Sequence, residues 1–317
     1  MKKLFAMLLA LMMTLSLTAC GESTQSEKPA ETPAETESQD AETAEPEAEP
    51  DAEAEVPQED QEEPAAQEET EIQVFIAASL NNAFEELVQM YGERYPNVKI
   101  TLNADSSGTL LSQIEEGYEC DIFFSAAAKQ MNQLEEDGLA VEGTRVNLLR
   151  NEVVLITWKG SGTAVTGLEN LSEAASMALA DGSVPAGNYT RKALQAMGVL
   201  DAEATSSDIT TETVSEALGG LEINECSNVS KVLQAVAEGS NEVGTVYYSD
   251  AYSDIDRVDI LEHLSPDLTG DIIYPVAQVV NPEADEAQTA AAADFLAFLQ
   301  TDEAMEVFET YMFLDNR

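Results

Sequence analysis

Basic side chains, histidine and cysteine are all scarce in this chain of 317 residues. Only 14 Lys and Arg side chains stand against 61 Asp and Glu, so the formal net charge is −47. A protein that binds nucleic acid needs clustered cations for the phosphates, and the acidic chain argues against that class. The single His and the three Cys lack the spacing of zinc ligands, which argues against a zinc site.

The shortage of candidate bases also argues against an enzyme. A serine nucleophile needs a general base, and the one histidine, His263, stands in a segment without a recognisable motif. No Lys follows a Ser by three residues, and no glycine-rich loop ends in Gly-Lys-Ser or Gly-Lys-Thr. We therefore expect no catalytic residues, and we expect His263 to be a surface side chain.

The N-terminus has the pattern of a secretion signal. Lys2 and Lys3 precede an apolar run over residues 4–17, which is too short for a permanent membrane-spanning helix. The run leads to small residues and then Cys20, an ending that resembles the lipobox of bacterial lipoproteins. The resemblance implies that residues 1–19 are a signal peptide and that lipid on the Cys20 thiol holds the protein on a membrane. An ordinary signal peptide with a chance cysteine is the alternative.

The segment after Cys20 has a different composition. Between residues 22 and 71, Glu, Ala, Pro and Thr alternate, with about 20 acidic side chains, one Lys and no aromatic residue. Such a segment cannot bury enough apolar surface to offset its ordering entropy, so we expect residues 20–71 to be a disordered acidic linker. It would serve as a flexible tether that lets the folded part reach away from the lipid anchor, or as a spacer whose length has no functional role.

From residue 72 onward, apolar runs typical of strands alternate with amphipathic patterns typical of helices. This order predicts α/β architecture with a parallel sheet and helices on both faces. Two such series suggest two lobes, formed by residues 72–149 plus 273–317 and by residues 150–272, with crossings near Arg150 and Ile273. The predicted strands cover residues 72–77, 98–102, 121–125, 153–156, 177–180, 243–248 and 274–280, and the predicted helices cover 80–91, 109–116, 128–137, 189–197, 229–236, 290–299 and 303–311.

Small and hydroxyl-bearing residues collect where predicted strands end and helices begin. Ser79 is a good N-cap for the helix from Leu80, and Ser107 stands in the same position after the second strand. Residues 184–187 and 226–229 precede two later helices. Free N–H groups and the positive end of the helix dipole can bind an anion at such places without a side-chain cation.

Six motifs resemble those of the molybdate-binding proteins of bacterial ABC importers, in the same order from Ile72 to the C-terminus. The most specific is Val-Pro-Ala-Gly-Asn-Tyr at residues 184–189. The resemblance implies the type II periplasmic-binding fold, with two α/β lobes joined by two crossing segments and an oxyanion enclosed between them. The six motifs occupy residues 77–83, 106–115, 121–126, 184–189, 244–251 and 274–277.

Five ligand-binding residues follow from the resemblance. Ser79 and Ser107 would donate hydroxyl and backbone N–H groups from the first lobe. Ala186 and Val229 would donate backbone N–H groups from the second lobe, and Tyr247 would donate its phenol. Val229 matches only by its spacing before the motif at residue 244. The chain departs from the family at residue 127, where Ala replaces the usual Asp, which puts a helix cap or an interlobe contact in doubt.

The resemblance implies that the protein binds molybdate, and tungstate as its near-isostere, outside the cytoplasmic membrane. It would deliver the ion to an ABC transporter permease and its ATPase. No cofactor and no metal cation are expected, since molybdenum would arrive as its oxyanion. We expect a lipid-anchored monomer on the extracytoplasmic face of the cell membrane, without a nucleic-acid partner.

Proteins of the same fold class bind other ligands, and two of these are alternatives for this chain. Adjacent Tyr247 and Tyr248 would suit ferric iron, although successive strand side chains point to opposite faces and Tyr248 is then expected to pack elsewhere. Sulfate or phosphate is the other alternative. Cys120 and Cys226 are expected to be unpaired small apolar residues, with a single disulfide as the alternative in an oxidising compartment.

Overall fold

A computed structural model describes residues 69–317. They belong to one compact unit. The predicted signal peptide, the lipidation site Cys20 and the acidic linker up to residue 68 lie outside the described residues. Within the described part of the chain, no helix combines the length and the apolarity needed to cross a membrane.

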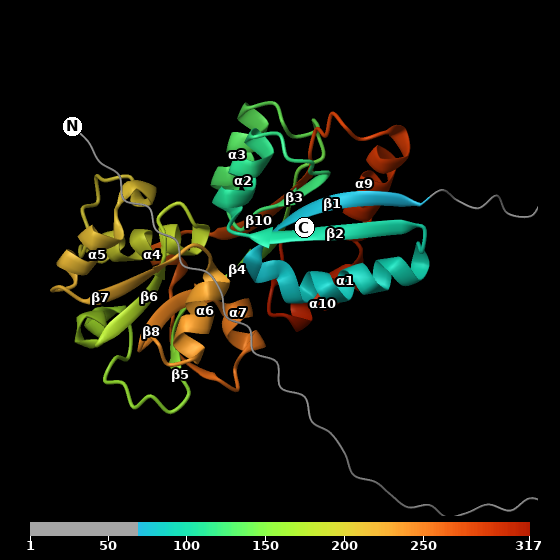
Figure 1. Cartoon of the computed structure of the whole chain (residues 1–317). Coiled ribbons are helices and arrows are strands. Elements are labelled where there is room, and N and C mark those ends of the chain that lie inside the picture. Colours follow the sequence, from blue (N-terminus) through green and yellow to red (C-terminus); the bar gives the residue numbers. More distant parts are fainter. Residues whose placement is uncertain (1–68) are drawn as a thin grey trace, which may run out of the picture. The chain divides into compact units, whose positions relative to one another are not determined.

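The first sheet has six strands in the order β11-β4-β10-β3-β1-β2 (Figure 1). Strand β1 is parallel to both of its neighbours, β2 and β3. Strand β10 is antiparallel to β3 and β4, and β11 is antiparallel to β4. The strands are β1 (Thr70–Ala77), β2 (Val98–Asp105), β3 (Ile122–Phe124), β4 (Val146–Asn151), β10 (Ile272–Gln278) and β11 (Leu314–Asp315).

The second sheet has five strands in the order β7-β6-β8-β5-β9. Strand β6 is parallel to β7 and β8, whereas β5 is antiparallel to β8 and β9. The strands are β5 (Val153–Trp158), β6 (Ser176–Ala180), β7 (Glu222–Cys226), β8 (Val243–Tyr247) and β9 (Val258–His263). The apolar run at the start of β5 is fully buried, as expected for an inner strand covered on both faces.

The prediction of parallel sheets is wrong, because both sheets are mixed. A parallel pair needs a crossover connection, which the β-α-β segments supply for β1, β2 and β3. Strand β10 instead enters the first sheet from the second lobe, so no such crossover fixes its direction. The order of elements along the chain does not reveal which strands return from another lobe.

The helices include each one predicted from periodicity. The α-helices are α1 (Asn81–Arg94), α2 (Ser107–Glu115), α3 (Ala128–Glu136), α4 (Pro185–Ala196), α5 (Thr211–Ala217), α6 (Val229–Ala237), α7 (Tyr248–Ser253), α8 (Pro266–Thr269), α9 (Glu286–Phe298) and α10 (Asp302–Thr310). Three 3-10 helices are η1 (Ala78–Leu80), η2 (Leu168–Glu173) and η3 (Ser206–Asp208). The sequence did not predict β4, β7, β9, β11, α5, α7 or α8, which are short or carry no clean apolar period.

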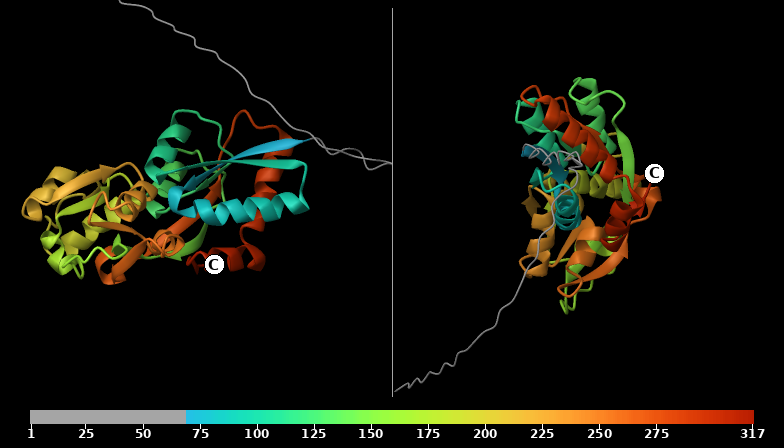
Figure 2. Two further views of the ribbon diagram at one scale, coloured as in Figure 1. Left: turned by 60° about the horizontal axis from the view of Figure 1, so that its bottom comes forward. Right: turned by 90° about the vertical axis from the view of Figure 1, so that its right-hand side faces the viewer.

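Alternating side chains of β3 bind helices to opposite faces of the first sheet. Phe123 lies in one apolar cluster with residues of α2 and α3. Phe124 faces the other way, with its ring centroid 5.8 Å from Phe84 of α1 and 6.1 Å from Phe308 of α10. Figures 1 and 2 show these helix pairs on the two sides of the sheet. The sheet is therefore an inner layer between two pairs of helices.

The two sheets form two lobes, with the chain passing between them twice. It leaves the first sheet after Asn151 and enters the second at Val153, and it returns between His263 and Ile272. The lobe boundaries that we place at Arg150 and Ile273 remain proposals. Both cysteines of the described part, Cys120 and Cys226, are buried and free, as the sequence had led us to expect.

Candidate functional site

A small cavity lies where the lobes meet, and all five residues singled out from the sequence line it. Ser79 and Ser107 come from the first lobe, and Ala186, Val229 and Tyr247 come from the second. About 10 Å³ of it is open to the centre of a water molecule, which is roughly the space that one water needs. The cavity is too small for a sugar or an amino acid.

Three helices begin at the cavity. Ser107 is the first residue of α2, Ala186 is the second of α4, and Val229 is the first of α6. The N–H groups of a helix's first turn have no intrahelical acceptor, and the helix dipole places partial positive charge there. Three such ends around one cavity place partial positive charge at its wall without a cationic side chain.

Local sequence explains why these helices begin where they do. The hydroxyl of Ser106 accepts from the backbone N–H of Thr109, and the side chain of Asn228 accepts from the N–H of Lys231. Both are N-cap bonds, which fix the first turn. Pro185 holds the first position of α4, where its fixed φ suits a helix and its missing N–H costs nothing. In α2 and α6 the cap binds the N–H group of the third helical residue, and α4 has no side-chain cap. The N–H groups of the first helical residues therefore stay free.

The expectation that Ser79 and Ser107 act as N-caps is wrong. Ser79 lies inside the 3-10 turn η1, the N-cap of α1 is Leu80, and Ser106 caps α2. The Ser79 hydroxyl is instead 3.0 Å from the Tyr274 hydroxyl. The strand–helix junction takes a 3-10 turn first, which shifts the helix start beyond Ser79. The apolar periodicity does not report this shift.

The hydroxyl of Ser107 accepts a hydrogen bond of 2.9 Å from the backbone N–H of Ala126. A hydroxyl oxygen that accepts one bond still has its own proton to donate. Because Ser107 is buried at the cavity wall, that proton has few places to point other than into the cavity. The bond from Ala126 therefore orients the hydroxyl.

Tyr247 carries the clearest unused donor at the site. Its side chain is buried and lines the cavity, and its hydroxyl has no hydrogen-bond partner of normal length within the described residues. Burial raises the pKa of the Tyr247 phenol well above its usual value, so the phenol stays protonated. The neighbouring Tyr274 hydroxyl lies beyond normal hydrogen-bond length but contributes to the raised pKa of Tyr247. A buried polar group without a partner is costly, typically ~1–3 kcal/mol. The site thus holds an O–H group that a ligand oxygen would satisfy.

A buried polar chain connects the cavity to the segments that cross between lobes. The Tyr274 hydroxyl contacts Ser79, and the amide of Asn151 donates to it at 3.3 Å. The same amide donates to the Ser249 hydroxyl at 2.9 Å. Asn151 ends β4, immediately before the first crossing, and Tyr274 lies in β10, just after the second. The position of Ser79 therefore depends on both crossings.

None of the twelve described residues that line the cavity is a Lys or an Arg. One lining residue is acidic. The Asp105 carboxylate accepts from the backbone N–H of Ser106 at 2.7 Å and from the Asn228 amide of the other lobe at 3.0 Å. These bonds occupy one carboxylate oxygen and fasten the lobes beside the cavity.

Comparison with known proteins identifies the family. The model of the family described as "Bacterial extracellular solute-binding protein" matches residues 72–314. The chain belongs to this family. It is thus a solute-binding protein and not an enzyme, and the two-lobed fold expected from the sequence is confirmed.

Three relatives illustrate the similarity. The chain is 32% identical to the "Putative ABC transporter substrate-binding lipoprotein YvgL" of Bacillus subtilis, over 76% of this chain and 85% of the relative. It is 30% identical to the "Molybdate-binding protein ModA" of Escherichia coli, over 78% and 91%. A solved "substrate binding domain of putative molybdenum ABC transporter from Clostridium difficile" is 29% identical with a TM-score of 0.56, over 78% of this chain and all of that one.

The solute-binding protein also holds a buried arginine behind the cavity that the sequence did not indicate. Arg191 is 0% exposed. Its guanidinium donates to the carbonyls of Ala180, Gly187 and Ile209 at 2.8 to 3.0 Å, and to the Thr211 hydroxyl at 3.1 Å. It therefore braces the turn that presents Ala186 while adding a positive charge one helical turn away. The i,i+4 spacing to Gly187 is visible in the sequence, but the contact with Ile209 is not.

Gly187 is required by close approach of the backbone. A Cβ atom at this position would lie 2.2 Å from the carbonyl oxygen of Ala180 and 2.3 Å from that of Asp181. Such distances are far inside van der Waals contact, and backbone atoms cannot move aside as a flexible side chain would. The start of α4 can reach the cavity only with glycine here.

Three further expectations have outcomes in the structure. Tyr248 begins α7, and its ring lies 4.8 Å from that of His263 rather than in the cavity lining. The His263 side chain is 48% exposed and pairs with Glu152 at 2.9 Å, as expected for a surface residue. Ala127 is the N-cap of α3 and provides no side-chain cap, so the cap that the family pattern led us to doubt is missing.

Metal ligation by side chains finds no support in the part of the chain described. No group of three or more His, Cys, Asp or Glu side chains is arranged there to hold a metal ion. The chemistry of the cavity is instead that of N–H and O–H donors. These groups bind oxygen atoms and suit an anion.

Proposed function

We propose that the protein binds molybdate, and also tungstate, and hands the ion to an ABC importer. The observation that carries the proposal is the buried, unpartnered hydroxyl of Tyr247, a residue that lines a cavity where three helix N-termini meet. The names of the relatives from Escherichia coli and Clostridium difficile support the choice of ligand.

Neutral donors at fixed positions select a tetrahedral dianion by size and by protonation state. In our proposal Ser79 and Ser107 donate hydroxyl and backbone N–H groups. Ala186 and Val229 donate backbone N–H groups, and Tyr247 donates its phenol. A smaller ion such as sulfate would leave longer bonds. Hydrogen phosphate would need an acceptor for its proton, and Asp105 is the one carboxylate near enough to serve. Sulfate and phosphate are therefore the competitors to test.

Ferric iron is the less suitable alternative. Phenolate ligands would be required, yet burial raises the pKa of Tyr247, and Tyr248 packs against His263 and Tyr252. We expect no tyrosinate-to-iron colour when ferric ion is added to the protein. A visible charge-transfer band would favour iron over the oxyanion.

Delivery would take place at the outer face of the cytoplasmic membrane. We propose that lipid on Cys20 anchors the chain, that the acidic segment between Cys20 and β1 forms a flexible tether, and that a permease with its ATPase accepts the ion. The lipoprotein name of the Bacillus subtilis relative supports this arrangement. Metabolic labelling with a fatty acid, in the wild type and in Cys20→Ser, tests the anchor, and equal labelling of both would contradict it.

Isothermal titration calorimetry with molybdate, tungstate, sulfate and phosphate tests the ligand. We expect molybdate and tungstate to bind with similar affinity and much more tightly than the other two. Absence of binding heat and of thermal stabilisation with both molybdate and tungstate would refute the proposal. Preferential binding of phosphate would identify phosphate as the ligand of this site.

A further inference from the structure

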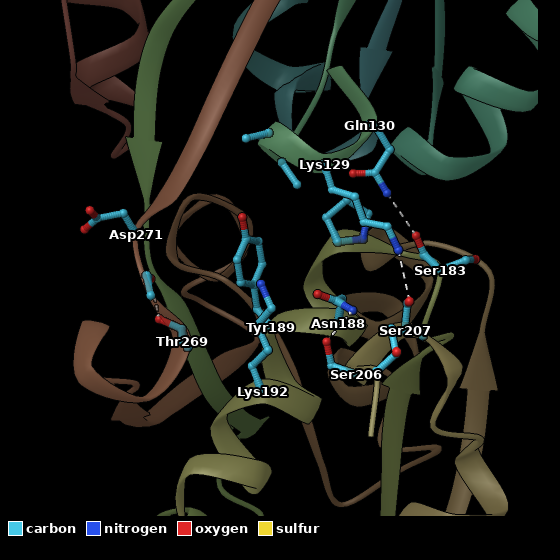
Figure 3. A pocket seen from close by; sticks show the side chains of 16 residues that line it. Lys129, Gln130, Ser183, Asn188, Tyr189, Lys192, Ser206, Ser207, Thr269 and Asp271 are labelled. Atoms are coloured by element: carbon cyan, nitrogen blue, oxygen red, sulfur yellow. Dashed lines mark hydrogen bonds between the residues drawn. The ribbon is translucent and has the colours of Figure 1, made fainter. Parts of the chain in front are cut away.

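A second, larger pocket lies between the lobes, next to the oxyanion cavity (Figure 3). About 350 Å³ of it is open to the centre of a water molecule, a size typical of small-molecule sites, roughly 300–1,000 Å³. It shares Pro185 with the cavity and continues along the same two segments, from Ala126 to Ala127 and from Val184 back to Ser183. Its volume is far larger than one inorganic oxyanion needs.

Two lysines from different lobes line this pocket. Lys129 belongs to α3 of the first lobe, and Lys192 belongs to α4 of the second. Partial burial, and after it the charge of Lys129, lower the pKa of Lys192, so the two ammonium groups are near enough to repel each other. Within residues 69–317, neither forms an ion pair with a carboxylate. The Lys192 ammonium lies 5.1 Å from the centroid of the Tyr189 ring. In so acidic a protein, two cations that line one pocket without a carboxylate partner point to an anion.

The polar groups between the lysines are mostly hydroxyls and amides. Lys129 donates to the Ser207 hydroxyl of the other lobe at 2.9 Å, and Asn188 and Ser183 line the pocket as well. The one acidic lining residue is Asp271, which Figure 3 shows on the opposite side of the pocket from Ser207 and Lys129. An anion held at Lys129 would therefore be kept away from it.

Gln130 supplies an unused acceptor at the wall. Its side chain is 7% exposed, its amide donates to the Ser183 carbonyl at 3.4 Å, and its carbonyl oxygen has no donor within the described residues. A buried acceptor without a donor is costly. A ligand hydroxyl would satisfy it, while a carboxylate or phosphate oxygen would not.

We propose that this interlobe pocket binds a small organic polyanion that carries a hydroxyl group, such as a hydroxy di- or tricarboxylate. Lys129 and Lys192 hold two of its negative groups from opposite lobes, and Gln130 accepts from its hydroxyl. The ligand class follows from the two charges, the single unused acceptor and the volume. The site is separate from the oxyanion cavity, and the residues that define it are the same whatever ion that cavity binds.

Occupation of the pocket couples to lobe closure. An anion that touches both lysines bridges the lobes, and Thr269, Gly270 and Asp271 of the second crossing line the same pocket. A ligand that binds the closed form better than the open form shifts the equilibrium toward closure. It thereby strengthens oxyanion binding, and the oxyanion strengthens its binding by the same factor.

Calorimetric titration of the full chain in detergent with citrate, without any oxyanion, tests the site. Lys192→Gln and Lys129→Gln should each weaken citrate binding about ten-fold or more, the effect of losing one charged hydrogen bond. Lys99→Gln is the matched control, since Lys99 pairs with Glu71 on the first lobe far from the pocket, and it should bind citrate like the wild type. An equal loss of citrate affinity in all three variants would show that only net charge matters and would refute the proposed site. Absence of binding heat in the wild type at millimolar citrate would also refute it.

The hydroxyl requirement has its own comparison. Tricarballylate is citrate without the hydroxyl group, and it should bind the wild type several-fold more weakly than citrate, a preference that Gln130→Met should abolish. Equal binding of both acids to the wild type would overturn the role of Gln130. Because no molybdate is present, a failed citrate titration leaves the proposed oxyanion function untouched, and a failed molybdate titration leaves the pocket untouched.

Discussion

Removal of the Tyr247 hydroxyl should affect ligand affinity without lowering the stability of the unliganded protein. Tyr247→Phe should weaken molybdate binding by ~1.5–3 kcal/mol, the usual effect of a hydrogen bond to a charged group. The unliganded protein should be as stable as the wild type or slightly more so, because the hydroxyl has no partner to lose. Calorimetry and thermal unfolding measure the two effects. Tyr248→Phe is the control, and if both variants bind normally, Tyr247 is not a ligand donor.

The serine hydroxyls differ from Tyr247 because each already bonds to the protein. Ser107→Ala removes the acceptor of the Ala126 N–H, and Ser79→Ala removes the contact with Tyr274. We expect each to weaken molybdate binding by ~1.5–3 kcal/mol and to lower the free energy of unfolding by ~1 kcal/mol. Titration and denaturant unfolding on the same samples measure both. Lower stability with unchanged affinity would assign these serines a structural role only.

At the scale of elements, the start of α4 is the part that sequence alone could not position. It is built from Pro185 at the first helical position, Gly187 against the β6 carbonyls, and Arg191 against the turn behind it. The first two residues belong to a motif visible in the sequence. The brace by Arg191 depends on Ile209, eighteen residues away, and hence on tertiary structure.

Gly187→Ala should displace this start. Its methyl group would overlap the carbonyl oxygens of Ala180 and Asp181, so the first turn of α4 must move and carry the Ala186 N–H with it. We expect molybdate affinity to fall at least ten-fold, about the worth of one hydrogen bond to a charged group, and amide exchange to increase at the N-terminus of α4. Gly92→Ala in α1 has open space around it and should instead stabilise the fold by ~0.5–1 kcal/mol. Normal affinity in Gly187→Ala would exclude α4 from the site.

At the scale of the whole molecule, Asp250 makes stability depend on pH. Burial raises the pKa of this carboxyl from 3.8 to about 7. The folded state therefore keeps a proton that the unfolded state releases, and the stabilisation is complete below pH 3.8 and lost as pH rises through about 7. Asp250→Asn keeps an oxygen to accept the Tyr247 N–H.

The Asp250→Asn variant should therefore lose less stability than the wild type between pH 4 and pH 8, by at most ~4 kcal/mol. Denaturant unfolding across this pH range measures the difference. Asp256→Asn, at an exposed position, should follow the wild-type curve. Parallel curves for wild type and Asp250→Asn would show that Asp250 is not the group responsible.

Net charge acts on the rate of capture rather than on the contacts in the cavity. At low ionic strength, the formal charge of −47 repels a dianion at long range. At physiological salt concentration this repulsion is largely screened beyond about 8 Å. The association rate of molybdate should therefore rise with added potassium chloride, as stopped-flow measurements would detect. A rate that falls with salt would mean that the lysines of the second pocket dominate the approach.

The sequence by itself determined the lobed α/β class and most of the helices, because apolar periodicity is a local property. The five candidate donors followed from the resemblance of short motifs to those of a known family. Only the tertiary structure decided the antiparallel strands, the 3-10 turn that frees Ser79 from capping, the brace by Arg191 and the pocket between Lys129 and Lys192. Each of these depends on segments far apart in the chain, and the hydrogen bonds and charges that define them exist only after the lobes have come together.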